Sequence, residues 1–183
     1  MLRLMQTSTL RRLRSHALVT TLAIACTLPG ASVAAVAPPL RTDGIGPLKL
    51  GMRQNAAVAT GWLAGRTLGC ELAGPNRPIV YKFNGAKAPA GIDGTAEFSG
   101  GKLRTLAFSN GVTTTKGVVA GVSTIKQMLA RYRTAPFSAS ARFDTTFVGT
   151  FVTVRRGSRS VMGAFGEKKI VALIAVPAVP VCE

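Results

Sequence analysis

The stretch GVVAGVSTIKQMLARY, residues 117–132, carries the clearest folding signal in this 183-residue sequence. Its apolar side chains recur at the spacing of one helix face, at Ile125, Met128, Leu129 and Tyr132. Ser123 precedes this stripe and is expected to be the N-cap, because its hydroxyl can accept a backbone N–H of the first turn. Pro136 is expected to end the helical region. The stretch therefore predicts an amphipathic helix that follows a glycine, Gly121.

A weaker copy of this pattern occurs in the first half of the chain, at residues 47–63, PLKLGMRQNAAVATGWL. Gly51 and Gly121 lie 70 positions apart, and each stands between an apolar pair and an expected helix, the first of which is expected at 53–63. Further along, AEFSGGKLRTL (96–106) matches GAFGEKKIVAL (163–173) at an offset of 67. We therefore expect an α+β fold class, with two tandem helix-plus-antiparallel-sheet halves in one domain.

Short apolar or alternating runs predict the strands of both halves. They are expected at 48–50, 79–83, 95–98, 103–108, 147–156, 160–165 and 170–176. The paired glycines in Ser99–Lys102 favour a hairpin turn, because glycine tolerates positive φ. Three phenylalanines that step by four, Phe143, Phe147 and Phe151, are expected to share one strand face and to lie in the core.

The first 34 residues have the pattern of an export signal. Basic residues at 3–14 precede an apolar run at 17–28, and small residues at 32–34 offer a cleavage site. Two alternatives stay open: an uncleaved anchor, and lipidation of Cys26 at a sequence that loosely resembles a lipobox. The expected organisation is a signal peptide (1–34), an extended lead-in (35–46), a first half (47–111) and a second half (112–183), in a secreted, periplasmic or cell-envelope protein.

Cleavage after Ala34 leaves two cysteines, Cys70 and Cys182, in an exported protein. Two thiols in an oxidising compartment most simply form one disulfide. Cleavage also removes the only histidine, His16, so a zinc site or a histidine base is not expected. The seven carboxylates are scattered singly along the chain. We therefore expect no metal and no cofactor.

Beyond residue 34 the chain carries 19 Lys and Arg against 7 Asp and Glu, and residues 102–169 carry 12 basic against two acidic side chains. A field of this sign attracts polyanions at low salt, although a solvated basic surface is the alternative. The densest basic set is the candidate polyanion-binding site: Arg155, Arg156, Arg159, Lys168 and Lys169. The expected partner is an anionic envelope polymer or another secreted or envelope protein. Export argues against nucleic acid, and membrane contact is expected only through an uncleaved signal or a lipid anchor.

The segments Gly46–Met52 and Gly117–Thr124 resemble those of secreted bacterial proteins of uncharacterised function. The helix-plus-meander repeat looks like the β-lactamase inhibitor protein and outer-membrane-assembly lipoprotein type of fold. A cysteine after the first helix and another near the C-terminus fit that resemblance. The resemblance implies a sheet face or loops that bind another protein, without catalysis.

Ser123 and Lys126 match the S-x-x-K pattern of penicillin-recognising enzymes, in which a lysine activates a serine one turn away. The accompanying S-D-N and K-T-G strings do not occur in the sequence. We therefore assign no catalytic residue, and expect an exported, non-catalytic binding or cell-envelope-associated protein. The alternative is a small secreted hydrolase that uses an unrecognised carboxylate or Ser–Lys site.

Overall fold

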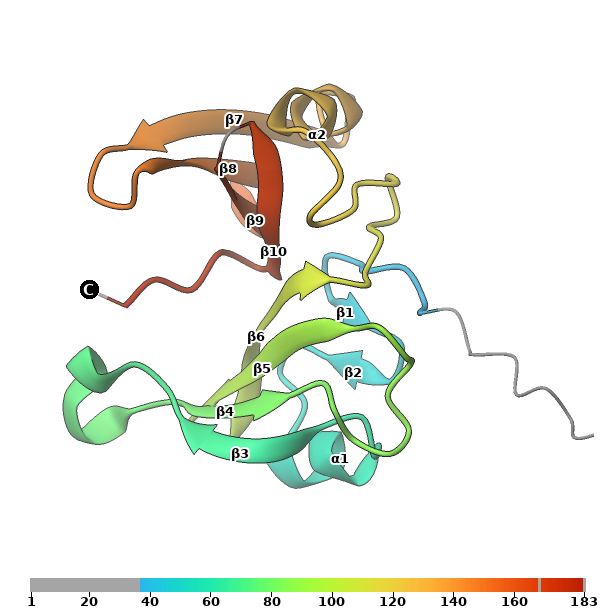
Figure 1. Ribbon diagram of the computed structural model, residues 1–183, viewed down its shortest axis with the longest axis vertical. Helices are drawn as coiled ribbons and strands as arrows, with labels where there is room; N and C mark the ends of the chain where they lie inside the picture. Colours follow the sequence, from blue (N-terminus) through green and yellow to red (C-terminus); the bar gives the residue numbers. More distant parts are fainter. Residues whose placement is uncertain (1–36, 168, 183) are drawn as a thin grey trace, which may run out of the picture. The chain divides into compact units, whose positions relative to one another are not determined.

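The computed structural model describes residues 37–167 and 169–182 (Figure 1). The expected export signal, with its cleavage site and Cys26, lies outside the described residues. Within the described part, no helix is long and apolar enough to cross a membrane.

An eight-stranded antiparallel sheet dominates the fold, in the order β3-β4-β5-β6-β10-β9-β8-β7. Its strands are β3 (Ala64–Leu68), β4 (Ile79–Lys82), β5 (Asp93–Ser99), β6 (Lys102–Asn110), β7 (Phe137–Asp144), β8 (Gly149–Arg156), β9 (Arg159–Glu167) and β10 (Ile170–Val176). A small hairpin pairs β1 (Gly44–Ile45) with β2 (Leu48–Lys49). The helical elements are α1 (Gln54–Ala59), α2 (Ile125–Arg131) and the 3₁₀ helix η1 (Glu71–Asn76). The fold is therefore mainly β, with less helix than the expected α+β class implies.

Several expected element bounds need correction. The helix expected at 53–63 ends at Ala59, because the chain turns through Gly61 at φ +76°. The lead-in expected to be extended contains β1, whose Ile45 pairs with Leu48. Strands β3 and β7 were not expected, and both are edge strands of the sheet. An edge strand buries little, so its sequence lacks a strong apolar alternation, and pairing with β4 or β8 determines its structure.

The first and second halves of the sheet meet in its middle, where β6 pairs with β10 and Ala107 lies opposite Ala175. One row of paired residues crosses the second half of the sheet on one face and runs into the first half. This row is Ala141, Val152, Ala164, Ile174 and Phe108. We call this face, which also carries the buried Leu106 and Phe98, the inner face.

Each helix start is hydrogen-bonded to the last hairpin of its own half. The N–H of Gly51 donates to the Leu103 carbonyl over 2.7 Å, and the N–H of Gly121 donates to the Val171 carbonyl over 2.7 Å. Both glycines have positive φ, 84° and 76°, a conformation that glycine adopts without steric cost. Leu103 and Val171, the two acceptors, lie 68 positions apart in the sequence.

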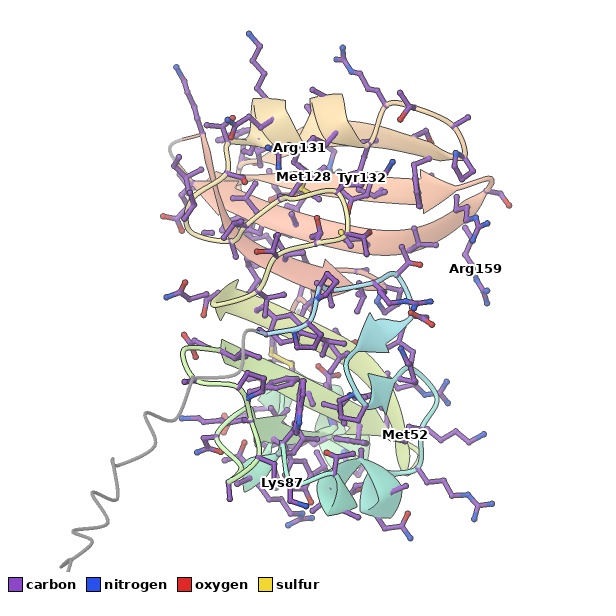
Figure 2. The ribbon with its side chains drawn as sticks, turned by 90° about the vertical axis from the view of Figure 1, so that its right-hand side faces the viewer. Met52, Lys87, Met128, Arg131, Tyr132 and Arg159 are labelled. Atoms are coloured by element: carbon purple, nitrogen blue, oxygen red, sulfur yellow. A yellow bond between two sulfur atoms is a disulfide. The ribbon has the colours of Figure 1, made fainter. Side chains whose placement is uncertain are left out.

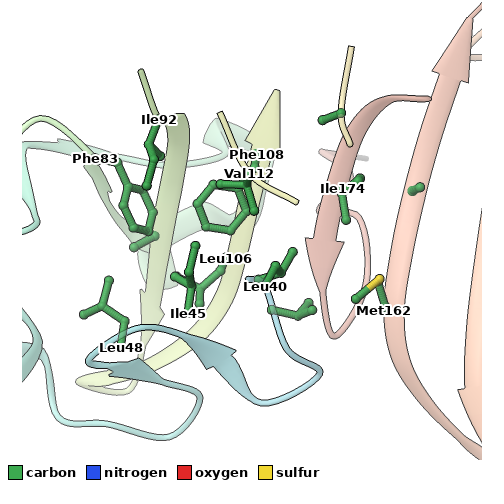
Figure 3. Packing of buried hydrophobic residues seen from close by; sticks show 14 of the residues in the cluster. Leu40, Ile45, Leu48, Phe83, Ile92, Leu106, Phe108, Val112, Met162 and Ile174 are labelled. Carbon is green, nitrogen blue, oxygen red and sulfur yellow. The ribbon is translucent and has the colours of Figure 1, made fainter. Parts of the chain in front are cut away.

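Aromatic rings and a segment near the N-terminus fill the inner face of the first half (Figure 3). The rings of Phe83 and Phe108 lie 4.9 Å apart, centroid to centroid. Side chains from residues 40–48 cover them, and Leu40, Ile45 and Leu48 are fully buried. The hydrophobic core of this half is therefore built from three separate parts of the chain.

In the second half, α2 covers the inner face (Figure 2). Its Met128 is fully buried, as is Tyr132 just after the helix, whose ring meets that of Phe137 on β7 edge-on at 5.6 Å. The helix begins one residue later than expected: Thr124 is the N-cap, and its hydroxyl accepts the Gln127 N–H at 3.1 Å. The Gln127 side chain accepts the Thr124 N–H in return, at 2.8 Å, which completes a capping box.

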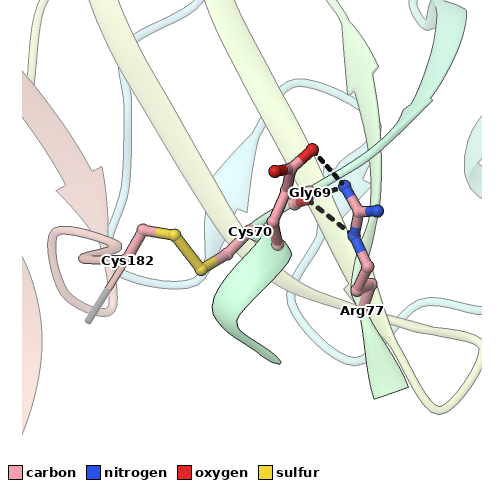
Figure 4. Close-up of a disulfide and its surroundings, with 5 residues drawn as sticks. Gly69, Cys70, Arg77 and Cys182 are labelled. Atoms are coloured by element: carbon pink, nitrogen blue, oxygen red, sulfur yellow. Dashed lines mark hydrogen bonds and ion pairs between the residues drawn. A yellow bond between two sulfur atoms is a disulfide. The ribbon is translucent and has the colours of Figure 1, made fainter. Parts of the chain in front are cut away.

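The expected disulfide between Cys70 and Cys182 is present (Figure 4). It joins the loop after β3 to the C-terminal segment 177–182, which lies against the outer face of the sheet beside Glu97 and Thr105. On the same face the Ser160 hydroxyl donates to the Pro177 carbonyl at 3.1 Å. The disulfide therefore ties the end of the second half to the first half.

Candidate ligand-binding groove

The candidate polyanion-binding residues do not lie on one surface. Arg155 and Arg156 end β8, and Arg159 begins β9, where its side chain points away from the sheet (Figure 2). Lys169 lies in the β9–β10 turn, at the opposite end of β9. Nine residues of strand separate the two turns by roughly 25–30 Å. Lys168 lies outside the described residues. The three arginines and Lys169 therefore belong to different regions.

Lys169 instead lines a groove of about 690 Å³ beside α2. The walls come from α2, the β7–β8 turn and the β9–β10 turn. Ile125 and Leu129 of α2 face the end of β7, where Phe143 is 61% exposed, and Val148 of the turn is 72% exposed. Large exposed apolar side chains that gather around one hollow are typical of an interaction site. We call this hollow the α2 groove.

The floor of the α2 groove is made of small residues. Thr150 of β8 pairs with Gly166 of β9, and Gly149 precedes Thr150. A Cβ at Gly166 would lie 2.4 Å from the Ile170 carbonyl oxygen and 2.8 Å from the Ile125 side chain. Glycine at this position therefore lets α2 lie close to the sheet.

The rim of the α2 groove is basic. Lys126 and Arg133 contribute from the α2 side and Lys169 contributes from the facing turn, and all three residues are exposed. Among the described residues that line the groove, Glu167 is the single carboxylate. The groove therefore offers apolar walls with an excess of positive charge.

Two residues of the groove have an unusual backbone conformation. Among the described residues, Val148 (φ 49°) and Lys169 (φ 75°) are the non-glycine residues with positive φ. This conformation is sterically costly, most of all for a β-branched side chain such as Val148. Backbone strain of this kind concentrates at functional sites in proteins. That both residues line the same groove supports its assignment as a site.

The phenylalanines at 143, 147 and 151 do not share a face, contrary to expectation. The chain turns between them, because the Asp144 carboxylate accepts the Thr146 N–H at 3.0 Å. Phe143 therefore ends β7 on the groove side. Phe147 packs edge-on against Phe151 at 5.6 Å, beside a separate hollow of about 410 Å³ next to the C-terminal segment. The expectation that all three belong to the core was wrong.

The first half also has a hollow, of about 740 Å³, between α1 and the β5–β6 turn. Polar and basic side chains line much of it, including Arg53, Asn55 and Lys102. The Gln54 side chain donates to the Tyr81 hydroxyl at 3.0 Å within this hollow. The apolar walls of the α2 groove have no counterpart of comparable size there.

The structure does not place Ser123 at the groove surface. Ser123 is 6% exposed, and its hydroxyl oxygen accepts the Val119 N–H at 2.9 Å. Its expected role as N-cap belongs to Thr124, so the hydroxyl closes the turn before the helix instead. Lys126 lines the groove. Within the described part of the chain, no group of three His, Cys, Asp or Glu could hold a metal ion.

Sequence reasoning identified the charge of this region but not the groove. The visible signal was the presence of two basic residues close to the apolar stripe of α2, Lys126 within the helix and Arg133 just after it. No pattern in the sequence marks Phe143 or Val148 as site residues, because they come close to α2 only through the pairing of β7 with β8. No family model, curated protein or solved structure matches this chain.

Proposed function

We propose that the protein is an exported, non-catalytic binding protein associated with the cell envelope, and that the α2 groove binds an anionic component of that envelope. The observation that carries the proposal is the combination of apolar walls with a basic rim in one hollow. Ligand sites are typically built this way, from apolar walls and a few charged or polar groups that fix the orientation of the ligand.

The composition and the covalent chemistry of the chain support the location. The Cys70–Cys182 disulfide is compatible with an oxidising compartment. The excess of basic side chains in residues 102–169 raises the local concentration of anions around the second half. Both features suit an envelope in which anionic polymers and lipids are abundant.

The proposal treats residues 47–111 and 112–183 as tandem copies of one helix-plus-antiparallel-sheet unit. In support, the backbone N–H of Gln54 donates to the Gly101 carbonyl, and the backbone N–H of Ile125 donates to the Lys169 carbonyl, both over 2.9 Å. The reversed strand order of the second half also places Ala107 opposite Ala175, its equivalent at the 68-residue offset. Under this view the two hollows beside α1 and α2 are equivalent in position, and the copies differ in the side chains that line them.

A small secreted hydrolase remains the alternative prediction. Its candidate nucleophile, Ser123, is buried and already accepts a hydrogen bond. Incubation with a fluorescent penicillin should leave the protein unlabelled. Covalent labelling of Ser123 would overturn the proposal of a non-catalytic protein.

The proposed function is tested by the retention of purified envelope fractions on the immobilised exported protein. The fractions are anionic wall polymer, extracted lipid and extracted protein, each applied at low salt and at about 1 M salt, where the Debye length falls to about 3 Å. The groove variant replaces Lys126, Arg133 and Lys169 by Gln. The matched control replaces Arg155, Arg156 and Arg159 by Gln, which removes the same charge from the other end of β9.

We expect at least one fraction to be retained by the wild type and by the control variant, and to be lost from the groove variant. Equal loss from both variants would show that net charge, and not the α2 groove, causes retention. Retention of no fraction by the wild type would contradict the proposed function itself.

A further inference from the structure

We infer that the ligand of the α2 groove is a fatty acid, that is, an unbranched acyl chain that ends in a carboxylate. This inference rests on the proposed function and names the ligand class of the same site. It follows from three features of the groove: the size of the hollow, the chemistry of its walls and floor, and the position of its cations.

The size of the groove suits a small amphiphile better than a folded partner. Its volume of about 690 Å³ falls inside the range of about 300–1,000 Å³ that is typical of small-molecule sites. A stable protein–protein contact buries about 800 Å² on each partner, which usually needs a broad surface. The α2 groove is instead confined between one helix of seven residues and two turns.

The walls and floor of the α2 groove offer few hydrogen-bond partners to the middle part of a ligand. Ile125 and Leu129 form one wall, and Phe143 and Val148 form the other. The floor consists of Gly149, Thr150 and Gly166. An acyl chain needs no hydrogen bonds along its length, so it can lie against these surfaces without losing any. A ligand with hydroxyl or amide groups along its body would leave those groups unpaired, which is costly.

Three cations line the same groove as the apolar walls. Lys126 and Arg133 come from the helix side and Lys169 from the facing turn, so an anion at one end of the chain can reach a cation while the chain lies between the walls. A carboxylate accepts strong, charge-assisted hydrogen bonds from lysine and arginine. The excess of these cations over Glu167 makes the groove complementary to one terminal negative charge.

The first experiment is a calorimetric titration of the purified exported protein with dodecanoate, below the concentration at which it forms micelles. Matched ligands are dodecanol, which keeps the chain and removes the charge, and octanoate, which keeps the charge and shortens the chain. Each additional buried CH₂ should tighten binding about fourfold until the groove is filled. Dodecanol should bind at least about tenfold more weakly than dodecanoate.

The second experiment locates the site with matched variants. Phe143→Glu places a negative charge on the apolar wall and should weaken dodecanoate binding at least about tenfold. The control is Leu68→Glu, which changes a side chain that is 54% exposed at the end of the other edge strand, β3. Both positions are exposed, so both variants should fold, and a thermal melt verifies this before the titration. Leu68→Glu should bind dodecanoate as the wild type does.

Equal affinity for dodecanol and dodecanoate, or unchanged binding by Phe143→Glu, would overturn the inference. A third arm distinguishes other occupants by offering lysophosphatidylglycerol and an acidic peptide to the same variants. If either of these binds in a groove-dependent manner and dodecanoate does not, the fatty-acid inference fails while the proposed function stands. If no probe binds and no envelope fraction is retained, both fail.

Discussion

The two halves of the sheet, β3–β6 and β7–β10, differ in how their inner faces are filled. In the first half, aromatic rings such as Phe83 and Phe108 pack together, and residues 40–48 cover them. In the second half the strands carry small residues such as Ala139 and Ala164 on this face, and α2 covers them. The two halves of the sheet therefore have different interiors.

This difference explains why the α2 groove occurs in the second half. Ile45 and Leu48 are fully buried and add a second layer of apolar side chains over the inner face of the first half. Phe143 and Val148 at the end of the second half stay exposed. The apolar side chains beside α2 are thus left exposed, whereas those of the first half are covered.

The largest expected effect comes from cutting the covalent link between the halves. Changing Cys70 and Cys182 together to Ser should lower the free energy of unfolding by about 2–4 kcal/mol, because the disulfide restricts the unfolded chain. The two cysteines are 112 positions apart, so the bond closes a long loop, and the unfolded chain gains conformational entropy when the bond is absent. Urea unfolding at equilibrium measures this loss.

Reduction of the wild type provides the control, since it should lower the stability by a similar amount. A thiol titration of the denatured, unreduced protein should find no free thiol from this pair. Unchanged stability in the serine variant would show that packing between β6 and β10 is sufficient to hold the halves together.

A smaller effect is expected from the caps of the two helices. Thr124→Ala removes the hydroxyl that accepts the Gln127 N–H and should cost about 1 kcal/mol. Helix α1 has Arg53 at its N-cap, in an extended conformation and with no side-chain cap. Arg53→Thr should therefore stabilise the protein, by up to about 1 kcal/mol.

Thermal and urea unfolding of the two variants measure the change, with Thr124→Ser as the control that keeps the cap. If Thr124→Ala has no effect, the hydrogen bond between Ile125 and Lys169 is enough to start α2. If Arg53→Thr does not stabilise, α1 depends on the sheet and not on its own N-terminus.

The sequence was sufficient for the elements that bury an apolar face. The stripe on α2 and the runs that become β6 and β10 were predicted, because burial selects their residues directly. The disulfide followed from the number of cysteines. The N-cap was missed by one residue, because Ser123 and Thr124 both carry a hydroxyl. The choice between them depends on the turn at Gly121, which is hydrogen-bonded to β10.

The candidate site was less predictable, because it depends on contacts between distant parts of the chain. The basic side chains at 155–159 and at 169 are close in sequence, but the length of β9 separates them in space. Lys126, Phe143 and Lys169 are far apart in sequence, but the register of β7, β8 and β9 brings their ends to α2. Proximity in sequence therefore identified the wrong neighbours for Lys169.

The smallest expected effect concerns Glu97, on the outer face of the first half, where the C-terminal segment of the second half lies against it. Partial burial raises the pKa of this carboxyl above its ordinary value of 4.5. The Glu97 carboxyl therefore loses its proton at a lower pH in the unfolded chain than in the folded protein. As the pH rises from 4.5 through the pKa of Glu97 in the folded protein, the free energy of unfolding falls. At neutral pH the whole of this loss in stability is present.

Glu97→Gln cannot ionise, so this variant should be more stable than the wild type at neutral pH and should lose that advantage below about pH 4.5. Urea unfolding of both proteins across this pH range measures the difference. The control is Glu71→Gln, whose native side chain is 87% exposed and should give no such gain. The variant lacking Cys70 and Cys182 extends the test, because release of residues 177–182 should expose Glu97 and reduce the pH dependence. If the pH dependence is unchanged in that variant, the strands around Glu97, and not the C-terminal segment, cause its burial.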